Sequence, residues 1–171
     1  MDPRVEYFNS LSPRERRIAI AEDILQQLEK QKFVDMRGDY ISVSPRKDME
    51  LLRETLATKT LDDFQNTCYV CAKGAIVLSA MNLFDGAVKC GIYQSWSRVP
   101  EGLEDTFTQN MWGAIERVYE LWLYGTVSDE VESYWESLSD RARMKAIFKN
   151  IIRNNGDFDP TDIPVAVSKD A

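Results

Sequence analysis

Residues 68–84 read CYVCAKGAIVLSAMNLF, the longest apolar run in the chain. A helix drawn through this run is apolar on every side, which is typical of a helix buried at the centre of a fold. Lys73, Ser79 and Asn82 interrupt the run, and its 17 residues are few for a membrane span. We therefore expect a central core helix over 61–84 and no contact with a membrane.

The flanking sequence carries the start signals of further helices. Residues 12–15 read SPRE, a complete capping box that predicts a helix from there to about Lys32. Ser139 caps the last helix, which ends before Gly156, a residue suited to the left-handed conformation at a helix end. Apolar periodicity and caps predict other helices near 46–58, from about 104 to 124, and from Ser128 to about Leu138.

A short β-hairpin is expected near 33–43. Apolar residues alternate there on both sides of Arg37-Gly38-Asp39. Alternation around a glycine-centred turn is typical of a hairpin, and we interpret the RGD tripeptide as that turn.

The expected fold is mostly α. About five or six helices and the small hairpin form a single-domain helical bundle over 1–171, with loose termini at 1–10 and 161–171. A glycine-containing connection over 86–102 is expected to hold a short strand at Ile92-Tyr93.

The composition excludes several kinds of site. The chain has 171 residues, a net charge of -7 and no histidine. Without histidine there is no Ser-His or Cys-His nucleophile pair, no two-His-one-carboxylate iron site and no zinc site with histidine ligands. An acidic chain repels phosphate backbones, which disfavours nucleic acid as a partner. These exclusions weigh against an enzyme. An enzyme that uses carboxylates as its catalytic groups stays a possible alternative.

Cys68 and Cys71 form a CxxC motif, and Cys90 is the third cysteine. Redox proteins hold such a motif at a helix N-terminus, where the helix dipole lowers the thiol pKa. Here the motif is expected inside the 61–84 helix, so we interpret the cysteines as small packing residues. Three thiols are one ligand short of a zinc site, and we predict no metal and no cofactor.

The stretch 98–140 combines acidic and aromatic residues. It holds ten acidic residues against two basic ones, Arg98 and Arg117. One interpretation is a solvated helical face, and the other is a surface that binds a protein partner. The spacing directs Trp122 to the core side of the 104–124 helix. The residues that we assign to the partner surface are Trp112, Tyr119, Tyr124, Glu130, Tyr134 and Trp135.

Arg141, Lys145, Lys149 and Arg153 recur every four residues in the last helix, which places them on one stripe. The plainer interpretation is a solvated face that pairs with the acidic residues of 129–136. The alternative is a groove that binds a small anionic ligand such as a nucleotide, with these four residues as its contacts.

Four segments together resemble a known family. They read RRIAIAEDI (16–24), RGDY (37–40), CYVCAKGA (68–75) and IIRNNGDFDP (151–160). In this order they are similar to a family of bacteriophage and bacterial proteins with a C-x-V-C-A-x-G-A helix and an N-I-I-x-N-x-G-x-F-x-P element. The likeness covers roughly 14–160. The family has no established activity, so the resemblance implies a phage or host-associated accessory protein and carries over no catalytic residue.

We therefore predict a non-enzymatic accessory protein of a phage or bacterium that acts through protein–protein interaction and inhibits a host factor. The alternative prediction is the small-ligand binder that uses the basic stripe. The mixed, polar N-terminal sequence has no secretion signal, which predicts the cytoplasm as the location, the host cytoplasm if a phage encodes the protein.

Overall fold

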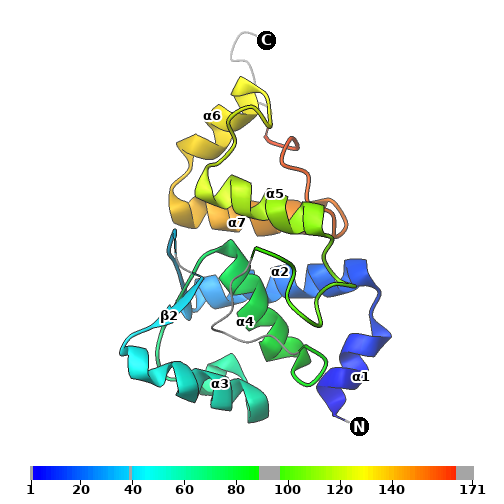
Figure 1. Ribbon diagram of the computed structural model, residues 1–171, viewed down its shortest axis with the longest axis vertical. Helices are drawn as coiled ribbons and strands as arrows, with labels where there is room; N and C mark the ends of the chain where they lie inside the picture. The colour runs from blue at the N-terminus through cyan, green and yellow to red at the C-terminus, as the bar shows by residue number, and fades with distance from the viewer. Residues whose placement is uncertain (1, 39, 89–96, 165–171) are drawn as a thin grey trace.

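A computed structural model of the chain describes residues 2–38, 40–88 and 97–164. In those ranges the chain forms seven α-helices and a three-stranded sheet around a shared hydrophobic core (Figure 1). In chain order the elements are α1 (Pro3–Ser10), α2 (Pro13–Glu29), β1 (Phe33–Asp35), β2 (Ile41–Val43), η1 (Arg46–Asp48), α3 (Met49–Thr58), η2 (Leu61–Asp63), β3 (Cys68–Val70), α4 (Ala72–Phe84), α5 (Gln109–Glu120), α6 (Asp129–Ser137) and α7 (Asp140–Arg153). The prediction of a mostly α fold is confirmed, with seven helices in the described ranges in place of the five or six expected.

The centre of the fold is α4, in which eleven of the thirteen residues are buried. Helices α1, α2, α3 and α5 all pack against it. In Figure 1, α5 and α7 run side by side above α2 and α4, and α6 lies at the opposite end of the molecule from α3. The apolar character of α4 on every side therefore reflects burial by other helices. Within the described part of the chain, no helix combines the length and the apolar character that a bilayer crossing requires.

The predicted helix over 61–84 is wrong in its first half. Residues Leu61–Asp63 form only the 3-10 turn η2, and Cys68–Val70 form the strand β3. The helix α4 begins at Ala72, with Cys71 as its N-cap. A continuous apolar run does not distinguish a buried strand from a buried helix, because neither shows an alternation of apolar and polar residues.

The predicted hairpin near 33–43 is also wrong, because its two strands do not pair with each other. The sheet has the order β1-β3-β2, with β3 in the middle. β1 pairs with β3 in parallel, with Phe33 opposite Cys68, and β2 pairs with β3 antiparallel, with Ile41 opposite Val70. The burial of the two outer strands does not alternate over their three residues, and their partner lies more than twenty residues further along the chain, where local sequence gives no sign of it.

The predicted helix over 104–124 is shorter than expected. α5 runs from Gln109 to Glu120, and Leu121 ends it in the left-handed conformation with φ +62°. The helix therefore ends before the expected end near residue 124. Because Leu121 turns the chain, Trp122 leaves the helical phase and points outward, with 61% of its surface exposed instead of facing the core.

The capping predictions hold at three helices. Ser12 and Glu15 form the expected capping box of α2, and the side chains of Ser128 and Ser139 cap α6 and α7. Gly156 adopts φ +92°, in the region that favours glycine, and its N–H donates to the carbonyl of Ile151 at 2.8 Å. Caps are local, so the sequence alone was sufficient to find them.

The N-terminal residues are more ordered than predicted. Pro3–Ser10, within the terminus expected to be loose, form α1. The guanidinium of Arg4 donates to the carbonyls of Leu56 and Lys59 at 3.1 and 3.2 Å, and the rings of Phe8 and Phe84 form a T-shaped pair with 5.4 Å between their centroids. The predicted strand at 92–93 lies outside the described residues.

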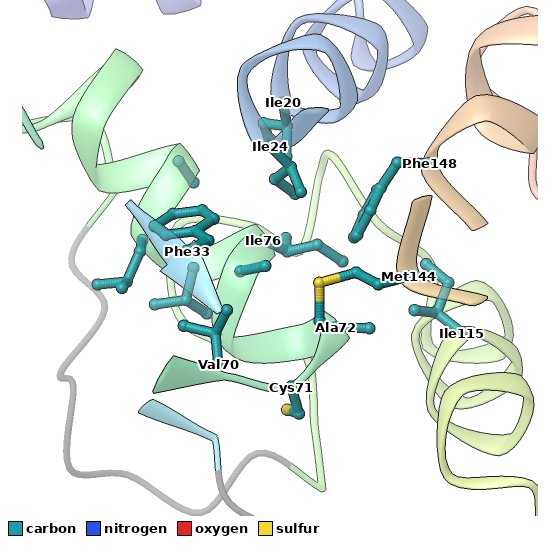
Figure 2. Close-up of a cluster of buried hydrophobic side chains, with 14 of the residues drawn as sticks. Ile20, Ile24, Phe33, Val70, Cys71, Ala72, Ile76, Ile115, Met144 and Phe148 are labelled. Carbon is teal, nitrogen blue, oxygen red and sulfur yellow. The ribbon is translucent and has the colours of Figure 1, made fainter. Parts of the chain in front are cut away.

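The core joins the sheet to helices α2 to α7, and Figure 2 shows part of it. Ile20 and Ile24 of α2 approach Ile76 of α4, and the side chain of Met144 extends from α7 toward Ala72. All five side chains are at most 1% exposed. Removing apolar surface of this extent from water is the main stabilising contribution to such a fold.

Gly74 is a position where an added side chain would clash with backbone. A Cβ there would lie 1.7 Å from the backbone oxygen of Tyr40, whereas a Cβ at Gly113 in α5 would meet only the flexible end of Arg117 at 3.1 Å. We expect Gly74→Ala to lower the free energy of unfolding by at least about 2 kcal/mol. Gly113→Ala should stay within about 1 kcal/mol of the wild type. Urea denaturation of the three proteins measures both values, and equal stabilities would contradict the close approach.

Candidate functional site

A hollow of about 350 Å³ lies between α6, α7 and the segment that follows α7. We call it the α6–α7 hollow. It is lined by Tyr134, Trp135, Leu138, Ala142, Lys145, Ala146, Lys149, Arg153, Asp162 and Pro164. The structure thus brings together three of the four residues of the predicted basic stripe and two of the predicted partner residues.

The aromatic wall of the α6–α7 hollow is held in place by a hydrogen bond and by contacts between rings. The indole N–H of Trp135 donates to the carbonyl of Pro160 at 2.9 Å. The ring of Tyr134 meets that of Trp135 edge-on, with 5.1 Å between the ring centroids, and Phe158 packs on the same indole at 6.4 Å. Trp135 is buried and Tyr134 only half-buried, so Tyr134 is the ring that a ligand would meet.

The segment that forms the third wall is fixed by Asn150, a buried side chain of α7. Its amide N–H donates to the carbonyl of Asp159 at 2.6 Å, and its amide oxygen accepts from the N–H of the same residue at 3.0 Å. Asp162 accepts from Arg153 at 2.8 Å and from Asn154 at 2.9 Å. These hydrogen bonds lower the pKa of the Asp162 carboxyl, with the one from Asn154 as the largest cause. The hollow is therefore built from a defined backbone path.

The cations of the α6–α7 hollow differ in their partners. Lys145 pairs with Glu29 at 2.7 Å, and this hydrogen bond lowers the pKa of the Glu29 carboxyl. Arg153 pairs with Asp162. Lys149 is exposed and forms no ion pair within 4 Å with any residue that the structure describes. The hollow thus carries three cations and one carboxylate of its own.

Arg141, the fourth residue of the predicted stripe, lies elsewhere. Its guanidinium donates to the carbonyl of Leu28 at the end of α2, at 2.9 Å. It does not line the α6–α7 hollow. The four-residue spacing therefore predicted the stripe but not which of its members face the hollow.

The residues assigned to a partner surface divide by burial. Trp112 and Tyr119 are at most 1% exposed and belong to the core, as does Trp135. Trp112, Tyr119 and Trp135 therefore cannot present their side chains to a partner in this conformation, which corrects the assignment of all three. Tyr124 is 93% exposed and Glu130 is exposed as well, so both are on the surface as predicted.

A second hollow, of about 170 Å³, lies beside Trp122. We call it the Trp122 hollow. It is lined by Gly38, Tyr40, Cys71, Glu116, Glu120 and Trp122. Sequence reasoning missed Trp122 because the helical spacing of 104–124 directed it inward. The left-handed Leu121 has no glycine or asparagine to signal it, so no local feature pointed to the exposure.

The charges of the Trp122 hollow are unequal. Glu116 pairs with Lys73 at 2.6 Å, and Lys73 is a buried residue of α4 with 1% of its side chain exposed. The carboxylate of Glu120 accepts from the backbone N–H of Gly38 at 3.3 Å. Glu116 is therefore paired with a cation, whereas Glu120 has no cation within 4 Å among the residues that the structure describes.

Both described cysteines are buried thiols. Cys71 is at the N-terminus of α4, where its sulfur accepts from the N–H of Gly74 at 3.4 Å, and not inside a helix as expected. Burial nevertheless raises the pKa of Cys71 to about 11 and that of Cys68 to about 12. Among the described residues no three cysteine or carboxylate side chains are grouped to hold a metal ion. Cys90 lies outside the described residues.

Comparisons with protein-family models, with curated protein sequences and with solved structures gave no match. The resemblance to the phage and bacterial family therefore stays a prediction that rests on the quoted motifs.

We expect the thiols of Cys68 and Cys71 to react slowly with iodoacetamide in the folded protein. At pH 8 their raised pKa values leave the thiolate of each at least about a hundredfold rarer than in an exposed cysteine. Peptide mapping by mass spectrometry after timed alkylation measures the rate at each site. The protein in guanidinium chloride is the control, where both should react rapidly. Fast alkylation of Cys71 in the folded protein would show that α4 stabilises its thiolate.

Proposed function

We propose that the protein acts by binding another protein and carries out no chemistry of its own. The observation that supports this most is the exposure of Trp122 and Tyr124, at 61% and 93% of their surfaces, two residues apart in the chain. Single exposed aromatic residues are common in folded proteins. Two large rings at one chain reversal, beside a hollow, are typical of the anchor residues of protein interfaces.

The partner that we propose presents a basic surface. The stretch 98–140 that contains both rings carries ten acidic residues against Arg98 and Arg117. Charge complementarity of this kind speeds association and favours basic partners over acidic ones. Exposed rings supply most of the affinity in such interfaces, while the surrounding charges give specificity.

The Trp122 hollow suits one lysine or arginine side chain of that partner. Trp122 and Tyr40 line it, and aromatic faces attract a cation. Glu120 adds a carboxylate that no cation within 4 Å neutralises among the described residues. A volume of about 170 Å³ accommodates one side chain, not a small-molecule ligand of ordinary size.

The resemblance to phage and bacterial proteins supports a host protein as the partner, with inhibition of that protein as the consequence that we propose. The absence of histidine from the sequence supports a role without catalysis, because histidine is the side chain best suited to proton transfer near neutral pH.

We expect Trp122→Ala and Tyr124→Ala each to weaken partner binding by about 2 kcal/mol, roughly thirtyfold in Kd. Candidate partners are proteins from a bacterial lysate that the wild type captures and the double Trp122→Ala, Tyr124→Ala variant does not. Each candidate is then purified, and its Kd is measured by isothermal titration calorimetry.

Leu51→Ala is the matched control, because Leu51 is a large apolar residue of α3 that is 50% exposed. It should leave the Kd unchanged. Glu120→Gln should weaken binding and make the Kd less sensitive to salt. Equal capture by the wild type and by the double Trp122→Ala, Tyr124→Ala variant would exclude this surface as the interface.

A further inference from the structure

We propose that the α6–α7 hollow binds a small anionic ligand with a planar ring, of the class of a nucleoside diphosphate. The protein-binding surface around Trp122 and Tyr124 does not use Lys145, Lys149 or Arg153. These three cations line the α6–α7 hollow together with the half-buried ring of Tyr134. The proposal is independent of the partner interface and adds a second binding site.

The shape of the α6–α7 hollow suits a small molecule. Ala142 and Ala146 on α7 leave room where longer side chains would fill the space, and Tyr134 and Leu138 of the α6 side form an apolar wall. The volume of about 350 Å³ falls within the range of small-ligand sites. The third wall is held by Asn150 and by the indole of Trp135, so the cavity exists before a ligand enters.

The charge of the hollow suits an anion. Lys145, Lys149 and Arg153 follow one another at one-turn intervals of about 6 Å, so a phosphate group between two of them contacts both. The carboxylates that pair with Lys145 and Arg153 are the exposed Glu29 and the more covered Asp162, with 72% and 37% of their side chains exposed. Ion pairs at exposed positions contribute little free energy, so an anionic ligand can compete with them. Lys149 forms no ion pair with a described residue, so a ligand displaces no carboxylate to reach it.

The ring of Tyr134 favours a nucleotide over an anion without a ring. Phosphate alone would use the cations and leave the face of Tyr134 uncovered, whereas a base can pack on that face and bury its apolar surface. A long nucleic acid would bring many phosphates close to a chain of net charge -7. A mononucleotide needs only the local cations, so the overall charge does not oppose it.

The test titrates the full chain with ADP, AMP, adenosine and pyrophosphate by isothermal titration calorimetry at low and high salt. ADP should bind more tightly than AMP, and both should bind more tightly than adenosine or pyrophosphate. Lys149→Ala should weaken ADP at least tenfold and reduce the salt dependence. Tyr134→Ala should weaken ADP while leaving pyrophosphate unchanged. Thermal unfolding of each variant checks that it is folded.

Lys47→Ala is the matched control, because Lys47 is an exposed lysine on η1, outside the hollow. It should bind ADP like the wild type. Absence of heat with every probe at millimolar concentration would overturn the proposal, as would ADP binding that Lys149→Ala leaves unchanged. Equal affinity for ADP and pyrophosphate would overturn the assignment of a nucleotide. None of these variants alters Trp122 or Tyr124, so the result leaves the protein-binding proposal to its own test.

Discussion

The backbone of Tyr40 lies against the first turn of α4 at a distance that only glycine at position 74 permits. The same carbonyl accepts the N–H of Cys71 at 3.2 Å, immediately before the helix begins. This contact joins the start of β2 to the point where β3 becomes α4. The register of the sheet and the direction of the central helix are therefore set together, because neither can shift without separating these backbones.

The Trp122 hollow follows from that contact. Tyr40 and Cys71 come to its wall through the junction of β2, β3 and α4, and Glu116 is held there by Lys73, which follows Cys71 by two residues. Replacing Glu116 alone would leave the buried Lys73 without its carboxylate. Losing one member of a buried ion pair destabilises a fold far more than losing an exposed pair. The Trp122 hollow on the surface thus depends on buried residues at the start of α4, although Trp122 itself comes from a loop.

Sequence reasoning succeeded where the cause is local. The caps at Ser12, Ser128 and Ser139 depend on residues within one turn, and the stripe of Lys145, Lys149 and Arg153 follows from the helical repeat. It failed where the cause is distant. The partner of β1 and β2 is a strand hidden in an apolar run, and the walls of the Trp122 hollow come from segments far apart in the chain.

The two hollows are opposite in charge, and the fold explains how one acidic chain carries both. The inward face of α7 is taken by Met144, Ile147, Phe148 and the buried Arg143, whereas the cations of the hollow, Lys145, Lys149 and Arg153, line its outward side. There the segment after Gly156 returns along the helix, tied by Asn150, and leaves the small residues Ala142 and Ala146 uncovered. Without the segment after Gly156, the same cations on α7 would form a solvated stripe. The tied segment turns the stripe into a concave site, where desolvation strengthens each contact between a cation and an anion.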